Sequence, residues 1–227
     1  MKLINYFLAG ALIALVTGST NQQTVETVSP VAYSLPDIVT DVEPNTNMID
    51  LSSVVRISCG HLSGTAEVIS RDIVLTAYHV VRQSVEEGVA CGIGQVPATP
   101  IYTNKALDFA IMSTTTGNSA RYAVDCKGFK VGSEYFAIGY PIDQFVVTRL
   151  IATDKFSSSE VHDGEQPLTG LRLLNGSVYH GMSGGPIVDK HGILVGTVVA
   201  TNDDYTQAAS RELKDTVLCT KKKNVRK

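Results

Sequence analysis

A serine in a glycine-rich turn is the part of this sequence best suited to covalent chemistry. The turn reads Gly181-Met182-Ser183-Gly184-Gly185-Pro186. A serine hydroxyl is a weak nucleophile at neutral pH, so it needs a neighbouring base to take its proton. Glycines allow a sharp turn and keep side chains away from the main-chain N–H groups. We therefore expect the N–H groups of Gly181 and Ser183 to stabilise a developing oxyanion.

Two apolar runs upstream supply a base and an acid. The run at 73–81 contains His79, and the run at 106–112 contains Asp108. An imidazole accepts the serine proton when a carboxylate holds it in the right tautomer. The other aspartates that we considered stand in turn-like stretches, namely Asp72, Asp143 and Asp189. The sequence therefore predicts a catalytic triad of His79, Asp108 and Ser183.

The three segments resemble the hallmark motifs of the chymotrypsin-like (trypsin-fold) serine proteases. The motifs are Thr76-Ala77-Tyr78-His79, Asp108-Phe109-Ala110-Ile111 and the turn around Ser183, and they follow the family's order of His, Asp and Ser. The resemblance spans roughly residues 51–202. It implies an all-β fold of two six-stranded antiparallel β-barrels with the active site in the cleft between them. On this template His79 and Asp108 belong to the first barrel and Ser183 to the second.

The serine turn also matches the Gly-x-Ser-x-Gly nucleophile elbow of the α/β-hydrolases. That fold places the acid and then the histidine after the serine. The only histidine downstream is His191, which is too close in the chain to Ser183 to reach it from a distant loop. Chain order therefore favours the trypsin-like fold.

The turn departs from the trypsin pattern at Met182. Zymogen-activated members have an aspartate there, which pairs with a new N-terminal amine, and methionine cannot form that ion pair. Residues 3–55 also contain no lysine or arginine for a trypsin-like activator to cut. The sequence is closer in style to the HtrA family and to short bacterial or viral protease domains that fold in the active form, and we expect no PDZ domain.

Short apolar runs bounded by turn residues independently indicate an all-β protein. The clearest runs are 54–59, 64–69, 135–140 and 192–200. The helical signal is weak, and we expect at most a short helix after Asp203. We assign 51–213 to a single protease domain and 214–227 to a basic C-terminal tail, with solvated charges as its default state.

The N-terminus has the pattern of an export signal. Lys2 precedes an apolar stretch that ends at Val16, and small residues follow, so we predict a signal peptide at 1–18 that is cleaved after Gly18. The stretch is shorter than the about 20 residues that span a bilayer. We therefore expect a secreted or periplasmic protein without a stable membrane span. Residues 19–50 are polar and acidic, which favours a disordered arm over a propeptide.

The sequence contains four cysteines, an even number that suits two disulfides in an exported chain. Three pairings are possible, and free thiols are the alternative. The resemblance implies Cys59 with Cys91, both in the first barrel, and Cys126 with Cys219, between the interbarrel crossover and the C-terminus. The family's disulfide across the histidine loop is absent because Val80 follows His79.

The resemblance implies that substrate preference depends on the residues that align with the family's specificity pocket. Five residues are candidates for this pocket: Ser177, His180, Val198, Val199 and Thr201. Ser177 aligns with the pocket floor and carries no charge, and Thr201 replaces a glycine that keeps the pocket open in other members. These changes imply a preference for small or medium uncharged P1 residues. His180 is interpreted as a rim residue rather than a ligand for an acidic P1 side chain.

The remaining features predict neither a cofactor nor a metal ion. His61, His162 and His191 stand in turn-like stretches without metal-ligand spacing. The formal net charge of -3 gives no general attraction to nucleic acid, so the expected partner is a protein or peptide substrate. A catalytically silent trypsin-like binding module and an esterase that uses the same triad are the alternatives. The oligomeric state is left open by the sequence.

Overall fold

The computed structural model describes residues 51–220 apart from 116–121, 142–143, 160–167 and 203. Two closed barrels, each of six antiparallel strands, make up most of the regular structure in this part of the chain. The predicted fold class is therefore confirmed. The predicted signal peptide and arm, residues 221–227 of the tail, Asp143 and His162 lie outside the described residues.

The first barrel is built from the N-terminal half of the described chain. Its strands pair in the order β1-β2-β3-β6-β5-β4, and β4 closes the barrel against β1. The 3-10 helix η1 (Leu51–Ser53) leads into β1. The strands are β1 (Val54–Cys59), β2 (Leu62–Ser70), β3 (Ile73–Thr76), β4 (Cys91–Ile93), β5 (Val96–Asn104) and β6 (Phe109–Thr114).

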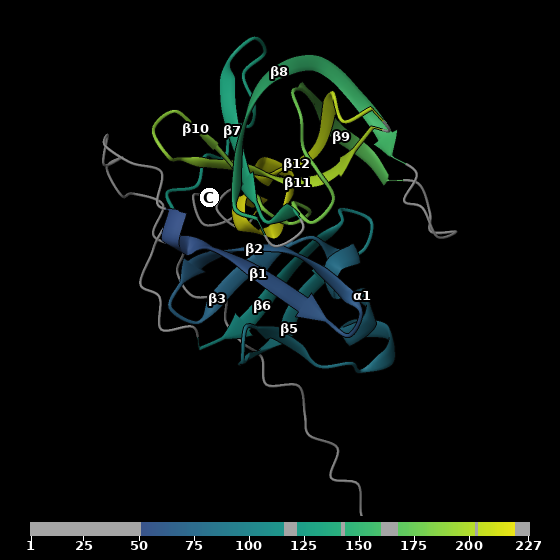
Figure 1. Cartoon of the computed structure of the whole chain (residues 1–227). Helices are drawn as coiled ribbons and strands as arrows, with labels where there is room; N and C mark the ends of the chain where they lie inside the picture. The colour runs from purple at the N-terminus through teal and green to yellow at the C-terminus, as the bar shows by residue number, and fades with distance from the viewer. Residues whose placement is uncertain (1–50, 116–121, 142–143, 160–167, 203, 221–227) are drawn as a thin grey trace, which may run out of the picture. The chain divides into compact units, whose positions relative to one another are not determined.

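The second barrel follows the crossover and has the order β10-β11-β12-β9-β8-β7. The strands are β7 (Glu134–Gly139), β8 (Val146–Ser159), β9 (Leu168–Asn175), β10 (Pro186–Asp189), β11 (Leu194–Thr201) and β12 (Gln207–Glu212), with the 3-10 helix η3 (Leu213–Asp215) after them. Figure 1 shows the strands of the first barrel, coloured from blue to teal, and those of the second, coloured from teal-green to yellow, as two groups.

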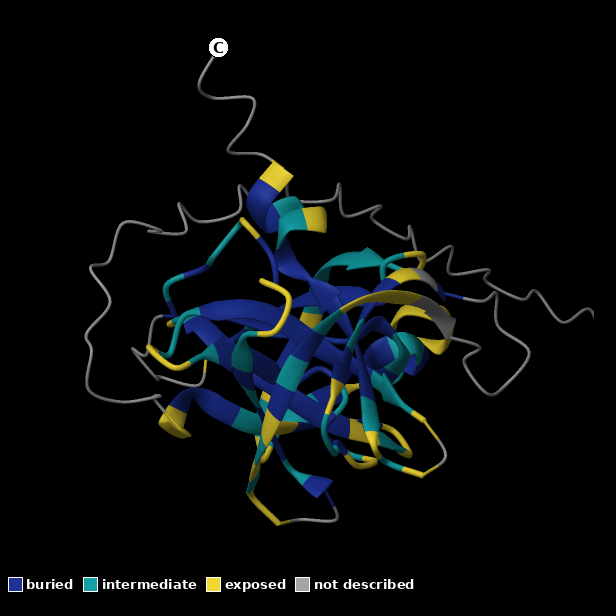
Figure 2. Cartoon of the chain, turned by 90° about the horizontal axis from the view of Figure 1, so that it is seen from above, coloured by how far each residue is buried: buried dark blue, intermediate teal, exposed yellow. Residues whose placement is uncertain are grey.

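Alternate residues of a strand face opposite sides, which gives each barrel its own core and leaves an apolar layer between the barrels. In β2, Ala66 and Val68 pack inside the first barrel. Ile69 instead packs in the layer that also contains Ile138 and Leu194 of the second barrel. Figure 2 shows the buried strand residues in dark blue and the exposed residues mainly at the turns. This shared layer holds segments of the two barrels against each other.

The sequence pattern did not predict the helix α1 (Tyr78–Glu87), because residues 73–81 form one continuous apolar run. The run contains strand β3 and then the first turn of the helix. Val80 and Val81 are buried against the first-barrel core, and Gly88 ends the helix in the left-handed conformation at φ 71°. An apolar run does not distinguish a buried strand from a buried helix, and this one includes both.

The two predicted cysteine pairs are confirmed. Cys59 and Cys91 join the paired strands β1 and β4 of the first barrel. Cys126 of the crossover is joined to Cys219 near the C-terminus. Leu218 and Cys219 are buried, and a helical turn covers 217–220. The packed part of the chain therefore extends past residue 213, where the sequence placed the end of the domain, because the disulfide and the apolar layer hold this segment.

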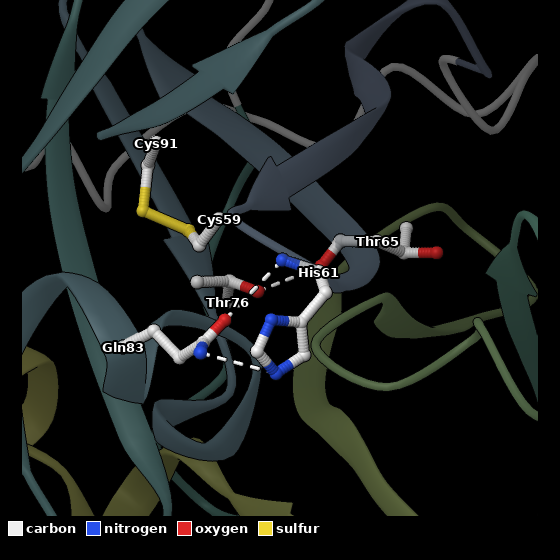
Figure 3. Close-up of a disulfide and its surroundings, with 6 residues drawn as sticks. All are labelled: Cys59, His61, Thr65, Thr76, Gln83 and Cys91. Carbon is white, nitrogen blue, oxygen red and sulfur yellow. Dashed lines mark hydrogen bonds between the residues drawn. A yellow bond between two sulfur atoms is a disulfide. The ribbon is translucent and has the colours of Figure 1, made fainter. Parts of the chain in front are cut away.

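A side chain of α1 ties the helix to the turn beside the first disulfide. Gln83 points toward His61 in Figure 3, and its Oε1 accepts the main-chain N–H of His61 at 3.3 Å. The Gln83 Nε2 lies 3.1 Å from the His61 Nε2. His61 is exposed, so its ring serves this turn at the surface of the first barrel.

Candidate active site

His79 and Asp108 form a two-point contact in the first barrel. His79 is the second residue of α1, and Asp108 directly precedes β6. The main-chain N–H of His79 donates to Asp108 Oδ1, and the ring Nδ1 lies against Oδ2, both at 2.8 Å. A carboxylate only accepts hydrogen bonds, so Nδ1 carries the proton and Nε2 carries the lone pair of the ring. The Asp108 side chain is 2% exposed and the His79 side chain 24%, which leaves the ring accessible.

A buried arginine of the second barrel supports Asp108 from the other side. Asp108 has a φ of 48°, which is uncommon for a residue other than glycine. The carbonyl of Leu107, in the peptide group that leads into Asp108, accepts a hydrogen bond from Arg211 Nε at 2.8 Å. Burial lowers the pKa of the Arg211 guanidinium, while the carboxylates of Asp215, Asp108 and Glu212 act in the opposite direction. The Arg211 guanidinium and the Asp108 carboxylate therefore attract each other.

Ser183 lies before β10, and one residue of β2 separates it from the helix that carries His79. Gly64 of β2 lies between the two: a Cβ on Gly64 would be 2.8 Å from the Ser183 carbonyl oxygen and 2.7 Å from a methyl of Val80, the residue after His79. The Ser183 hydroxyl donates to the Val199 carbonyl at 3.4 Å. Rotation about one side-chain bond frees this hydroxyl for another acceptor. The structure thus brings the predicted nucleophile to the helix of the predicted base.

The chain before Ser183 forms a four-residue turn from Tyr179 to Met182. The Met182 N–H donates to the Tyr179 carbonyl at 3.0 Å. Gly181, the third residue, has a φ of 95°, as a type II turn requires. A Cβ on Gly181 would also lie 2.5 Å from the Tyr140 carbonyl oxygen. Conformation and space therefore both demand glycine at this position.

Alternate peptide groups of this turn are fixed at both ends. The group between Gly181 and Met182 donates to the carbonyl that closes the turn and accepts from the Thr65 hydroxyl at 2.7 Å. The group between Ser183 and Gly184 donates to a carbonyl of β11 and accepts from the Thr65 N–H, both at 2.8 Å. Within the described residues, the N–H groups of Gly181 and Ser183 have no acceptor. These two N–H groups therefore remain the candidates for the predicted oxyanion donors.

The five residues predicted to line the specificity pocket do not all lie in one cavity. The side chain of Val198 packs in the second-barrel core, and that of Val199 in a neighbouring apolar cluster. Thr201 donates its hydroxyl to a carbonyl across the β11–β12 hairpin at 3.3 Å. Ser177 is partly exposed and His180 is exposed. Val198 and Thr201 therefore have clear structural roles in addition to their predicted ones.

A pocket of about 370 Å³ lies beside the turn. It is lined by Pro141, Gln144, Val146, Tyr179, His180 and Tyr205. The Tyr205 ring centroid lies 5.8 Å from that of Tyr179 and 5.8 Å from that of His180. Sequence reasoning missed both tyrosines, because Tyr205 reaches the turn from the distant β11–β12 hairpin. Its φ of 58° is another sign of a constrained site, visible only in the structure.

The described residues contain no cluster of three or more side chains able to hold a metal ion. Among the helices in the same part of the chain, none is long and apolar enough to cross a membrane.

The chain is similar to known proteases in sequence. A family model described as a trypsin-like peptidase domain matches residues 64–196, more than half of the chain. The serine protease Rv3671c of Mycobacterium tuberculosis is 29% identical over 141 residues, which cover 60% of this chain and 36% of that protein. The magnetosome formation protease MamE of Paramagnetospirillum magneticum is 32% identical over 143 residues, which cover 59% of this chain and 19% of that protein. The chain spans only about a third or less of these relatives.

Solved structures share the fold. The crystal structure of the active form of the Rv3671c protease superposes with a TM-score of 0.61 at 25% identity, covering 75% of this chain and 83% of that one. The crystal structure of Deg5 has a TM-score of 0.58 at 18% identity, covering 71% and 85%. The region matched by the family model contains His79, Asp108 and Ser183. This chain therefore belongs to the family of trypsin-like peptidase domains.

Proposed function

We propose that this protein is a serine endopeptidase that cleaves peptide bonds through an acyl-enzyme on Ser183. The proposal rests on the two-point contact of Asp108 with His79, together with Gly64, which lies between the Ser183 turn and Val80, the residue after His79. The open N–H groups of Gly181 and Ser183 add support. Membership of the peptidase family agrees with this reaction.

In the proposed reaction, His79 Nε2 takes the Ser183 hydroxyl proton while Oγ bonds to the substrate carbonyl carbon. Asp108 stabilises the imidazolium, and the N–H groups of Gly181 and Ser183 hold the oxyanion. The imidazolium then gives its proton to the leaving amine as the C–N bond breaks, which leaves an ester on Ser183. Water activated by His79 hydrolyses this ester and restores the serine.

A fluorophosphonate probe tests the proposed nucleophile. We expect the wild-type protein to be labelled at one serine and to hydrolyse peptides, and Ser183→Ala to lose both properties. Ser58→Ala is a suitable control, because Ser58 is an exposed serine of β1. An unlabelled wild-type protein would favour the silent binding module, whereas labelling with hydrolysis of esters but not of peptides would favour the esterase.

The P1 preference is proposed to be for alanine, valine or leucine over arginine or phenylalanine. Ser177 offers no charge to a basic side chain, and Thr201 occupies a position where larger pockets have glycine. We expect kcat/KM for the preferred residues to be about 10- to 100-fold higher than for arginine. Cleavage profiling on a peptide library measures this ratio, and preferred cleavage after lysine or arginine would contradict it.

Export through a cleaved signal peptide is proposed as well. Two disulfides agree with an oxidising compartment. We expect the mature protein to begin at Ser19 when it is expressed with an active secretion pathway. N-terminal sequencing checks this, and an intact Met1 on the exported protein would count against cleavage.

A further inference from the structure

The Ser183 turn must be held without an ion pair at the residue before the nucleophile. Met182 occupies that position, and its side chain is fully buried in the second-barrel core. Donors that stabilise an oxyanion are effective only when they are positioned before the reaction. Packing of Met182 anchors one side of the turn, but it does not by itself orient the peptide groups on either side of it.

Thr65 of β2 supplies the missing orientation from the first barrel. Its hydroxyl donates to the Gly181 carbonyl at 2.7 Å, and its main-chain N–H donates to the Ser183 carbonyl at 2.8 Å. The first carbonyl belongs to the peptide group that precedes Met182 and the second to the one that precedes Gly184, so one residue holds two peptide groups of the turn. The Ser183 N–H belongs to the peptide group between these two, and the Gly181 N–H to the peptide group just before them. Fixing the two carbonyls therefore limits how those N–H groups can rotate.

The direction of the Thr65 hydroxyl is set by a second contact. Its oxygen accepts the Tyr140 N–H at 3.0 Å, which leaves its own proton for the Gly181 carbonyl. The carbonyl of Thr65 accepts the Thr76 hydroxyl at 2.8 Å, and Figure 3 shows these two residues side by side. Thr65 is fully buried, and its N–H, C=O and hydroxyl are all paired. The residue is therefore itself rigid enough to orient others.

Close packing couples Thr65 to the glycines around it. A Cβ on Gly184 would lie 2.5 Å from the Thr65 carbonyl oxygen, and one on Gly185 would lie 3.1 Å from its methyl. On the opposite side, a Cβ on Gly139 would lie 2.9 Å from its hydroxyl oxygen. There is no room for a shift of Thr65 that leaves the turn in place.

We propose that Thr65 is a positioning residue whose hydroxyl fixes the Ser183 turn in the conformation that receives the oxyanion. The proposal rests on the serine endopeptidase function proposed above. Thr65 acts through Gly181 and does not touch the substrate. It performs across the barrel interface the task that a buried ion pair performs in zymogen-activated relatives.

Thr65→Val removes the hydroxyl and keeps the shape of the side chain. We expect kcat for peptide hydrolysis to fall about 10- to 100-fold with KM within about threefold of the wild-type value, because the oxyanion donors are no longer held in place. Thr65→Ser keeps the hydroxyl, and we expect it to retain kcat within about threefold. If the valine variant does not fold, Thr65→Ala is a second way to remove the hydroxyl. Alanine places no methyl group against the Tyr140 N–H.

Thr216→Val is the matched control. Thr216 is also fully buried, and its hydroxyl donates to the Leu213 carbonyl at 2.8 Å, away from the turn. We expect this variant to lose stability like Thr65→Val but to keep the wild-type kcat. A peptide boronate, whose adduct places an oxygen at the oxyanion position, should bind Thr65→Val about 10- to 100-fold more weakly, while binding of a cleaved product peptide stays unchanged.

Amide hydrogen exchange over residues 179–185 tests the positioning without any need for activity. We expect faster exchange in Thr65→Val and Thr65→Ala, and wild-type exchange in Thr65→Ser and Thr216→Val. Wild-type exchange of the turn in both deletion variants would overturn the proposal, as would a kcat loss in Thr65→Ser equal to that in Thr65→Val. An inactive wild-type protein would contradict the proposed function but not the role of Thr65, because the exchange measurement tests that role without activity.

Discussion

Replacing Ser183 with alanine is expected to lower kcat for peptide hydrolysis by about 10⁶-fold, and Asp108→Asn by about 10⁴-fold. Alanine removes the atom that forms the acyl-enzyme. Asparagine keeps the size of Asp108 but has only one acceptor, whereas Asp108 accepts both the main-chain N–H and the ring Nδ1–H of His79. The His79 ring then adopts the tautomer with its proton on Nε2. In this tautomer Nε2 cannot accept the serine proton. Steady-state kinetics on a peptide substrate measure both losses.

The activity of the double variant Ser183→Ala, Asp108→Asn shows whether the two residues act together in one triad or whether each change lowers activity independently. Residues that act as a unit are not additive, so we expect the double variant to be no slower than Ser183→Ala alone. Thermal unfolding of each variant provides the control, since neither change removes much buried apolar area. Near-full activity of Asp108→Asn in a folded protein would show that another group orients His79.

The parts of the fold and of the candidate site that the sequence predicts depend on short stretches of chain. Gly184 is an example: its φ of 80° is a conformation that favours glycine, so the local backbone requires the residue that makes the motif visible. The alternating strands were likewise predictable from their period of two. The fold follows from motifs of this kind, and the prediction that His79, Asp108 and Ser183 form a triad rests on them as well.

The supports of the site were not predictable, because their partners are far away in the sequence. Thr65 bonds to Gly181 across 116 positions, and Arg211 bonds to Leu107 across 104. A threonine in a strand and an arginine in a strand carry no local signal of such contacts. Thr65 contacts the turn, and Arg211 contacts the peptide group before Asp108, only because the two folded barrels pack against each other.

Glu67→Gln is expected to make the protein more stable, by an amount that grows with pH. Glu67 is fully buried in β2, and its strand neighbours Val54 and Leu75 belong to the apolar layer between the barrels. In the described part of the chain, neither carboxyl oxygen has a hydrogen-bond partner. Burial therefore raises the pKa of this carboxyl well above its usual range.

The sign of the effect follows from proton binding. Above its ordinary pKa of about 4.3, the unfolded carboxyl has lost its proton while the folded one keeps it. The folded state binds more protons in this range, so the free energy of unfolding of the wild type falls by about 1.4 kcal/mol per pH unit until the folded pKa is reached. This contribution of Glu67 is fully present below the unfolded pKa and is lost as pH rises. Glutamine does not ionise, so Glu67→Gln lacks this slope.

Urea unfolding between pH 5 and pH 9 measures the difference, with Glu67→Met as a second variant that also removes the buried polar atoms. Glu86→Gln is the control: Glu86 is exposed, and hydrogen bonds from Tyr78 and Lys105 lower its pKa. It should show no gain that increases with pH. Equal pH slopes for the wild type and Glu67→Gln would mean that the carboxyl finds a partner in the folded protein. Because Glu67 lies two residues after Thr65 on the same face of β2, its ionisation at high pH would loosen the strand that holds the Ser183 turn.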